Sequence, residues 1–419
     1  MGKVSSIQEV VSRGLCVSCG ACVSAAPAGS MRLVLDEKLG IFVPEIIDTE
    51  RARGDGVEFD VCPGKGLAIK KMASELYGPC SYASFELGRY RFAIAAHTTN
   101  QRILENASSG GVMTDISVFL IEKNLVDGVT ASRFVYGAPG PRTEAFIAHS
   151  LEELISAQGS KYCPTTTNQL VRKCLETGGH YLFIGTPCQI GALRLGIQQE
   201  PRLADIFPYT MANFCGGYRD FRALDRIVSS LGVEPSELDS FRFRGGGQPG
   251  SMLGRTRKGM TICEPYPAYG RRSVIPRQKR CWYCVDGTGE LADFACGDAW
   301  VPRFLEDESP WSIILARSRF AEQLVNEMAS IGRLKVQPIS FEEICKSQKT
   351  NIGSKKFRQY SRMRVSRLLG ITMPQWDVEL PRDNGSYLYE LCVLAGKTAV
   401  GQQLRRIMHF CKDSLKQSE

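Results

Sequence analysis

Three closely spaced cysteines constrain this chain more than any other feature of its sequence. Cys16, Cys19 and Cys22 form a Cys-x-x-Cys-x-x-Cys run. This spacing wraps three thiolates around one face of a cubane iron–sulfur cluster. The run therefore predicts that the amino-terminal segment is a small, loop-rich module organised around bound metal.

The fourth ligand of this cluster is predicted to come from farther along the chain. The bacterial ferredoxin pattern adds a Cys-Pro pair after the triad, and that cysteine ligates the other cluster of a two-cluster protein. Ala26-Pro27 takes this place here, whereas Cys62-Pro63 has the ending of a second ferredoxin half without the three cysteines that should precede it. One 4Fe-4S cluster held by the triad and Cys62 accounts for the cysteine that is missing before Pro27 and for the triad that is missing before Cys62. Four thiolates also suit a structural zinc ion, so zinc stays open as an alternative.

Cysteine usage also indicates the compartment. The chain has 16 cysteines, and a cytosolic protein keeps such thiols reduced. The amino terminus lacks the apolar core of a secretory signal, and no apolar stretch approaches the roughly 20 residues that span a bilayer. We therefore expect a cytoplasmic protein without a transmembrane segment, in which the cysteines serve metal or redox chemistry.

Length and periodicity favour a two-part or three-part chain with an α/β core. The 419 residues suffice for two or three domains, and an apolar content of 43% excludes disorder of the bulk. Strand-like and helical segments alternate from residue 92 onward, as in α/β folds. The expected strands are residues 92–96, 126–129, 181–185 and 311–316. The expected helices are residues 112–123, 151–157 and 165–176, residues 5–13 form a short amphipathic segment, and residues 241–250 are expected to form a loop.

Four further cysteines stand in loop-like settings. Cys188 follows a predicted strand, Cys215 precedes two glycines, and Cys281 and Cys284 form a Cys-x-x-Cys pair. These thiols can meet around a metal only through the tertiary fold. A redox dithiol at the Cys-x-x-Cys pair and a zinc site are the alternatives from the residues alone.

A glycine-rich turn precedes the predicted helix at residues 112–123. Bare N–H groups and the positive end of a helix after Ser108-Ser109-Gly110-Gly111 can bind a pyrophosphate. An ordinary helix cap is the plainer interpretation. The turn does not match the Gly-x-Gly-x-x-Gly dinucleotide fingerprint.

Several short motifs, in this order along the chain, resemble the coenzyme F420 hydrogenase/dehydrogenase beta-subunit family. The resemblance covers roughly residues 10 to 320 and is specific to the family but not to a substrate. The motifs are residues 106–111 (Asn-Ala-Ser-Ser-Gly-Gly), 159–162 (Gly-Ser-Lys-Tyr), 185–189 (Gly-Thr-Pro-Cys-Gln), 214–215 (Phe-Cys), 281–286 (Cys-Trp-Tyr-Cys-Val-Asp), 292–293 (Ala-Asp) and 297–300 (Gly-Asp-Ala-Trp).

The resemblance implies an α/β (α+β) flavin-binding core with FAD and a second 4Fe-4S cluster, preceded by a ferredoxin-like module. The implied domains are residues 1–80 for that module, 81–340 for the core and 341–419 for a basic, mostly helical extension. The second cluster would be held by Cys188, Cys215, Cys281 and Cys284, with Cys163 and Cys296 as extra thiols. The residues implied to bind FAD are Ser108, Ser109, Gly110, Gly111, Gly159, Ser160, Lys161 and Tyr162.

These parts together imply an iron–sulfur flavoprotein oxidoreductase. Clusters carry single electrons and a flavin exchanges two as a hydride, so electrons would run between a ferredoxin or another acidic carrier, the two clusters, FAD and a substrate. The substrate would be a small molecule or coenzyme F420, with other subunits of a redox complex as further partners. The alternatives are a non-catalytic electron-transfer subunit of a larger complex and a zinc-bound interaction protein.

The sequence assigns no catalytic acid. Asp286, Asp293 and Asp298 follow the Cys-x-x-Cys pair, but a loop aspartate is more often a turn or backbone cap, and the four histidines stand in no motif. Two basic clusters could dock an acidic carrier or an anionic substrate, or could be solvated surface. Their residues are Arg242, Arg244, Arg271, Arg272, Arg277, Lys279 and Arg280. Nucleic-acid binding fits less well, because no stacking aromatics are regularly interleaved with these charges.

Overall fold

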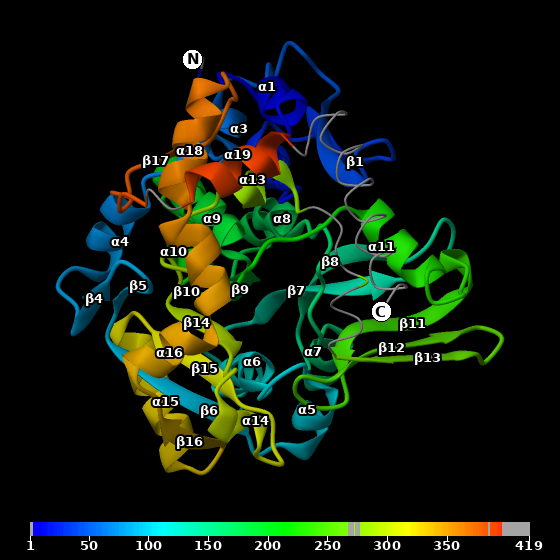
Figure 1. The fold of residues 1–419 in the computed structure, drawn as a ribbon, viewed down its shortest axis with the longest axis vertical. Helices are drawn as coiled ribbons and strands as arrows, with labels where there is room; N and C mark the ends of the chain where they lie inside the picture. The colour runs from blue at the N-terminus through cyan, green and yellow to red at the C-terminus, as the bar shows by residue number, and fades with distance from the viewer. Residues whose placement is uncertain (1–2, 267–271, 273–276, 384–385, 396–419) are drawn as a thin grey trace, which may run out of the picture.

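The computed structural model describes residues 3–266, 272, 277–383 and 386–395, and an eight-stranded mixed sheet forms its centre (Figure 1). The fourth to seventh strands across the sheet are parallel to one another, and every other pair of neighbouring strands is antiparallel. In order across the sheet the strands are β16 (Leu334–Pro338), β6 (Phe92–Thr98), β15 (Ser312–Ala316), β14 (Phe294–Asp298), β10 (Tyr209–Asn213), β9 (Tyr181–Gly185), β7 (Gly128–Val135) and β8 (Arg142–Ala148). This mixed α/β arrangement confirms the α/β prediction.

Alternating side chains of the central strands fill two apolar layers. Along β15, Ile313 and Leu315 pack into one layer, and Ile314 and Ala316 pack into the other. Successive side chains of a strand point to opposite faces, so a strand covered on both faces is apolar throughout. The helices that cover one face are α6 (Val112–Glu122), α7 (Leu151–Ser156) and α15 (Arg319–Ser330), and those on the other are α4 (Ile69–Tyr77), α8 (Leu170–Thr177), α9 (Pro187–Gln199) and α16 (Phe341–Ser347).

The amino-terminal residues form a small unit that packs against the core. Its hydrogen bonds to the core include Asn168 N–H to the Cys19 carbonyl (3.0 Å) and the Arg280 guanidinium to the Pro63 carbonyl (2.8 Å). Its elements are α1 (Ile7–Ser12), α2 (Ala21–Ala25), the hairpin of β1 (Met31–Asp36) and β2 (Ile41–Ile46), α3 (Val57–Asp60), the 3₁₀ turn η1 (Pro63–Lys65) and β3 (Gly66–Leu67).

A second, three-stranded antiparallel sheet lies beside the core and packs against α11 (Phe221–Ser229). Its strands are β11 (Leu238–Gly245), β12 (Ser251–Thr256) and β13 (Thr261–Pro265). Residues 241–245 were expected to be a loop, and this prediction is wrong. Phe241 and Phe243 alternate with two arginines and bury their rings, which makes the segment a half-buried strand.

The carboxy-terminal residues of the described part are helical and run back along the molecule (Figure 1). They also contact the amino-terminal unit, because β17 (Gln375–Trp376) pairs in parallel with β3 of that unit. The helical elements are α17 (Lys349–Ile352), the π-helical turn η4 (Gly353–Phe357), α18 (Gln359–Leu368) and α19 (Tyr387–Ala395).

The remaining elements are short. They are β4 (Tyr82–Ser84), β5 (Gly88–Tyr90), α5 (Gln101–Asn106), η2 (Thr167–Gln169), α10 (Leu203–Ile206), η3 (Pro235–Glu237), α13 (Lys279–Trp282) and α14 (Pro302–Leu305). Within the described residues, no helix has both the length and the apolar character that crossing a membrane requires. The domain boundaries near residues 80 and 340 and the cytoplasmic location stay predictions.

Candidate functional site

The four cysteines of the first set line one narrow hollow in the amino-terminal unit. Cys16 and Cys19 lie in the loop between α1 and α2, Cys22 lies in the first turn of α2, and Cys62 comes directly before η1. The apolar side chains around them include Val10 and, on β1, Leu33. Residues 40 positions apart in the sequence thus meet, as the ferredoxin-like pattern predicts.

Main-chain N–H groups point at the sulfurs of this first set. Ser18 N–H donates to Cys16 Sγ at 3.4 Å. Burial raises the pKa of all four thiols, that of Cys16 to about 12, while N–H donors beside each sulfur act in the opposite direction. Gly64 leaves no room for a side chain, because a Cβ there would stand 2.6 Å from Val10 Cγ1 and 3.2 Å from Cys62 Sγ.

The second set of cysteines is brought together from three separate segments. Cys188 lies in the first turn of α9, Cys215 follows β10, Cys281 lies in α13, and Cys284 follows that helix. Burial, and then the nearby Cys215 and Cys281, raise the pKa of Cys188 to about 12. Gly217 N–H donates to Cys215 Sγ at 3.3 Å. Burial, and then Cys215 and Cys284, raise the pKa of Cys281, so each thiol of the set interacts electrostatically with at least one other.

Two buried cations accompany the second set. Burial raises the pKa of the Cys284 thiol, but the Lys355 ammonium and the Arg280 guanidinium oppose it and hold that pKa below the usual value. Arg280 also acts on Cys62 of the first set and on Cys188 of the second. Arg280 also donates to the carbonyl of Pro63, next to Cys62, and directly precedes Cys281, so it lies between the two cysteine sets.

Tyr218 is the other residue near both sets. Burial raises the pKa of its phenol, and Cys281 and Cys16, one thiol from each set, raise it further. Tyr218 also packs in one apolar cluster with Cys19 and Cys188, so the two sets are neighbours. Among the described residues, no three or more His, Cys, Asp or Glu side chains are arranged to hold a single metal ion.

A cavity of about 620 Å³ opens at the carboxyl ends of the parallel strands, next to the second set. Phe214, Gly216 and Gly217, which flank Cys215, form part of its wall. The volume falls in the range of about 300–1,000 Å³ that is typical of ligand sites. Seven of the eight residues implied to bind FAD line this cavity: Ser108, Ser109, Gly111, Gly159, Ser160, Lys161 and Tyr162.

The eighth residue, Gly110, lies behind the cavity wall. A Cβ there would stand 2.5 Å from the Ala96 carbonyl oxygen, so the turn can approach the sheet this closely only with glycine. Gly111 has φ of +70° and precedes the first turn of α6 without a side-chain cap. The first N–H groups of α6 are therefore left for a ligand or for water.

Lys161 shapes the cavity wall through its ammonium group. Its Nζ donates to the carbonyl oxygens of Ala157 (2.7 Å) and Gly159 (2.9 Å), just beyond the carboxyl end of α7. Burial lowers the pKa of Lys161 to about 8. The side chain thus ties together the loop that carries the Gly-Ser-Lys-Tyr motif.

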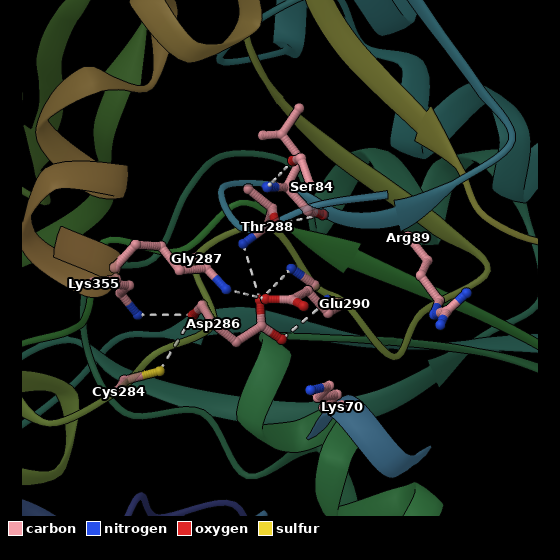
Figure 2. A network of polar contacts seen from close by, with 12 residues as sticks. Lys70, Ser84, Arg89, Cys284, Asp286, Gly287, Thr288, Glu290 and Lys355 are labelled. Atoms are coloured by element: carbon pink, nitrogen blue, oxygen red, sulfur yellow. Dashed lines mark hydrogen bonds and ion pairs between the residues drawn. The ribbon is translucent and has the colours of Figure 1, made fainter. Parts of the chain in front are cut away.

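The three aspartates after the Cys-x-x-Cys pair have structural partners. Asp286 is a loop cap whose carboxylate accepts the N–H groups of Thr288, Gly289 and Glu290 at 3.0, 2.8 and 3.0 Å (Figure 2). The Asp293 carboxylate accepts from Thr210 and Arg194, which joins β10 to β14. These contacts agree with the cap interpretation.

Asp298 forms an ion pair in the cavity wall. Its Oδ2 accepts from Arg244 Nη1 at 2.6 Å and from Trp300 Nε1 at 3.2 Å. Arg244 also donates to the Ser108 carbonyl at 2.7 Å. Two of the sequence motifs, residues 106–111 and 297–300, thus meet at this one arginine.

Both basic clusters were candidate docking surfaces. This prediction is wrong for one buried arginine in each cluster. Arg244 and Arg280 are 2% and 1% exposed, so neither can meet a partner protein. Lys279 donates to the Arg13 carbonyl, and Arg272 pairs with Glu264. Arg271 lies outside the described residues.

Other thiols and histidines fall outside the two cysteine sets. Cys163 packs in the apolar layer beneath β11, and Cys296 on β14 lies in the cavity wall. His97, His149 and His180 each hydrogen-bond a main-chain carbonyl through Nδ1. His409 lies outside the described residues.

Two models of one family match most of this core. Residues 93–172 match the N-terminal part, and residues 178–342 the C-terminal part, of the coenzyme F420 hydrogenase/dehydrogenase beta subunit. The chain belongs to this family. Residues 16–62, with the first cysteine set, precede both matches, and Lys355 lies after them.

Named relatives of this family are oxidoreductases or subunits of them. The coenzyme F420 hydrogenase subunit beta of Methanococcus voltae is 25% identical over 266 residues, which are 60% of this chain and 86% of the relative. A coenzyme F420-dependent sulfite reductase of Methanocaldococcus jannaschii is 24% identical over 374 residues, which are 84% of this chain. The chain spans about half of that reductase, 51% of its length.

A solved structure shares the fold. One chain of the F420-reducing [NiFe] hydrogenase complex of Methanosarcina barkeri, determined in a xenon-derivatised form, superposes with a TM-score of 0.55 at 20% identity. The superposition covers 68% of this chain and 96% of the other. The mixed α/β architecture is therefore that of a subunit of this complex.

Sequence reasoning missed the contribution of the carboxy-terminal helices to the cavity. Gln348 and Asn351 line it and donate to the Asp298 carbonyl (3.0 Å) and the Gly287 carbonyl (3.2 Å). They follow the last recognisable motif by about 50 positions, and no spacing in the sequence connects them to it. Only the tertiary fold brings them there.

Proposed function

We propose that this chain is an iron–sulfur flavoprotein oxidoreductase that relays electrons between a ferredoxin-like carrier and FAD. Its substrate is a small molecule or coenzyme F420, which is reduced or oxidised by two electrons. One observation carries the proposal: the first cysteine set, the second set and the 620 Å³ cavity adjoin in that order. Tyr218 and Arg280 lie between the two sets, and the residues around Cys215 form the cavity wall.

The donor sets fit 4Fe-4S clusters chemically. Each set offers four cysteines, with N–H donors aimed at Cys16 Sγ in the first and at Cys215 Sγ in the second. Iron bound to these thiols would keep them as thiolates, although burial opposes their charge. Each 4Fe-4S cluster would carry one electron at a time.

The cavity fits FAD through its glycine-rich turn. The first N–H groups of α6 would bind the pyrophosphate, and the Lys161-anchored loop, whose Ser160 N–H donates to Ser108 Oγ at 3.3 Å, would form the adjoining wall. Bound FAD would accept single electrons and exchange a pair as a hydride. The chain's own residues would orient the cofactor, since Arg244 joins Ser108 to Asp298 and thereby fixes the walls relative to each other.

Metal and flavin analysis tests the proposal directly. Protein purified without oxygen should contain about eight iron, about eight sulfide and one FAD per chain, since each cubane holds four iron and four sulfide. Its visible spectrum should show flavin and iron–sulfur absorption. Zinc in place of iron, with no flavin, would contradict the proposal and leave both cysteine sets as structural sites.

A non-catalytic electron-transfer subunit is the second candidate. It is favoured by the names of the matched relatives, which include beta subunits of hydrogenase and formate dehydrogenase. Iron without flavin would support it. With flavin present, reduction of that flavin by reduced F420 alone favours F420 as the substrate, whereas reduction only by ferredoxin or dithionite favours another small molecule.

A further inference from the structure

The buried charge of Lys355 lies outside everything that the family match covers. The lysine belongs to η4, beyond residue 342, where the match ends. Its side chain is buried, with 2% of the residue exposed. Residues 355–419 include 12 basic and 6 acidic residues, a composition typical of a solvated segment. The ammonium group of Lys355 nevertheless points inward.

The contacts of Lys355 place its ammonium against the second cysteine set. Its Nζ donates to the Asp286 carbonyl oxygen at 3.0 Å, and Cys284 Sγ lies 3.2 Å from the same oxygen (Figure 2). Lys355 also interacts electrostatically with Cys215 and Cys281. Three of the four sulfurs therefore lie within reach of one buried positive charge.

Neighbouring acids offset this charge only in part, because at Cys284 the effects of Lys355 and Arg280 outweigh that of the Asp286 carboxylate. The carboxylate of Asp286 accepts three main-chain N–H groups. Lys355 contacts the main-chain carbonyl of Asp286 and not this carboxylate. Glu290 forms an ion pair with the adjacent Lys356. Arg280 adds a second buried positive charge beside Cys188 and Cys284.

The surrounding helices fix the position of Lys355 and exclude water. Gln359 on α18 donates through Nε2 to the carbonyls of Trp282 (2.9 Å) and Cys284 (3.0 Å), and it is fully buried. Arg362 lies over the Trp282 ring at 4.0 Å. Charges act most strongly where water is excluded, because the local dielectric constant is low.

We propose that Lys355 raises the reduction potential of the cluster held by Cys188, Cys215, Cys281 and Cys284. Reduction adds one negative charge to a cluster, and a fixed positive charge nearby stabilises the reduced form more than the oxidised form. This inference rests on the proposed function, since it requires the second cluster. It assigns Lys355 a role in setting the potential, not in binding substrate.

The test compares midpoint potentials in Lys355→Met, Lys355→Gln, Lys355→Arg and wild-type protein, each titrated without oxygen and followed by electron paramagnetic resonance. Cys62→Ser, which leaves the second set intact, identifies the signal of the second cluster. Lys349→Met is the matched control, because it removes the same charge from an exposed position on α17.

Removal of the charge should make the second cluster harder to reduce. In Lys355→Met and Lys355→Gln we expect the equilibrium constant for its one-electron reduction to fall at least tenfold, which corresponds to about 59 mV. Lys355→Arg should restore most of the difference, and Lys349→Met should match the wild type. The signal of the first cluster should move less than that of the second.

The outcomes separate this inference from the proposed function. Wild-type protein without iron would overturn both. Full iron content in Lys355→Met with an unchanged or higher potential would overturn the tuning role alone. Loss of four iron atoms from both neutral variants, with retention in Lys355→Arg, would also overturn it, because Lys355 would then hold the cluster in place instead of setting its potential.

Discussion

At the scale of single residues, charged groups that look exposed in the sequence are structural parts of the interior. Asp286 shows this clearly: it is 3% exposed, and its carboxylate closes the loop that follows Cys284. A carboxylate that accepts several N–H groups holds a loop in one conformation, and its loss leaves buried donors without partners. The geometry of the second cysteine set thus depends on a residue outside that set.

Asp286→Ala should therefore destabilise the protein strongly. We expect a loss of about 3 kcal/mol in the free energy of unfolding, because hydrogen bonds to charged groups contribute about 1.5–3 kcal/mol and three donors lose their acceptor. Denaturant unfolding followed by circular dichroism measures it. The exposed Asp55→Ala is the control and should cost less than about 0.5 kcal/mol. Equal stability of the two variants would contradict the cap role.

Lys161 should make stability depend on pH. Its pKa is lowered by burial to about 8 from the usual 10.5, so between these values the unfolded chain binds more protons at this residue than the folded chain. Its contribution to stability therefore rises as pH increases through this range and is lost as pH falls below about 8.

The comparison is with Lys161→Met, which lacks the titrating group. The melting temperature of the wild type relative to this variant should increase between about pH 7.5 and 9.5. The exposed Lys173→Met serves as the control, and its difference from the wild type should stay flat. A difference that falls with pH for Lys161→Met would show that the ammonium form is favoured by folding.

Residue spacing alone could predict the first cysteine set, and the second set followed from the family resemblance, but neither predicted the role of the arginines. Cys16, Cys19 and Cys22 carry their chemistry in their spacing, and the structure gathers them with Cys62. Arg244 and Arg280 look like surface charges, because burial of an arginine depends on carbonyl and carboxylate partners from distant segments. Those partners are fixed by tertiary structure, which no local pattern encodes.

At the scale of elements, the carboxy-terminal helices hold the Cys281–Cys284 segment in place. Arg362 on α18 donates to the Trp282 carbonyl at 2.6 Å and pairs with Glu390 on α19 at 2.9 Å. Both side chains of this ion pair are buried, at 1% and 0% exposure. A buried pair is costly to break, because the remaining charge has no partner.

Arg362→Met should cost about 3–5 kcal/mol in unfolding free energy, since it leaves the Glu390 carboxylate buried and unpaired. The double variant Arg362→Met/Glu390→Leu should recover much of this loss. Denaturant unfolding of the two single variants, the double variant and the wild type gives the coupling between the residues. Strict additivity of the two single costs would disprove the coupling.

Strands were easier to predict at this scale where they are buried on both faces. The apolar runs at β6, β9 and β15 stand out, and each lies within one or two residues of its predicted bounds. β11 was missed because its arginines and glycines suggested a loop. The alternation of Phe241 and Phe243 with arginines was the available signal, since period-two alternation indicates a half-buried strand.

At the scale of the whole molecule, the two cysteine sets and the cavity form one continuous arrangement through the amino-terminal unit and the core. Its continuity depends on docking contacts such as that between Arg280 and Pro63. The order of motifs in the sequence indicated a shared site, but not that the sets are neighbours. That proximity results from packing between segments more than 200 positions apart.

Each cysteine set should hold its iron independently. Cys62→Ser should lower the iron content from about eight to about four per chain while the flavin is retained, because only the first set loses a ligand. Cys284→Ser should remove the other four. The exposed Cys263→Ser on β13 is the control and should keep the full content. Loss of all iron in Cys62→Ser would show that the two sets are not separate sites.

The chain positions of the two sets also give an order to synthesis. The first set is complete once Cys62 has left the ribosome, and its cysteines come from one short stretch. The second set needs Cys284, and its enclosure needs residues 349–368 as well. Since domains fold from the amino terminus during translation, the first site can mature while the chain is still growing. The second must wait until the residues up to Leu368 have been made, so a ribosome stalled between these two points would release a chain with only the first set complete.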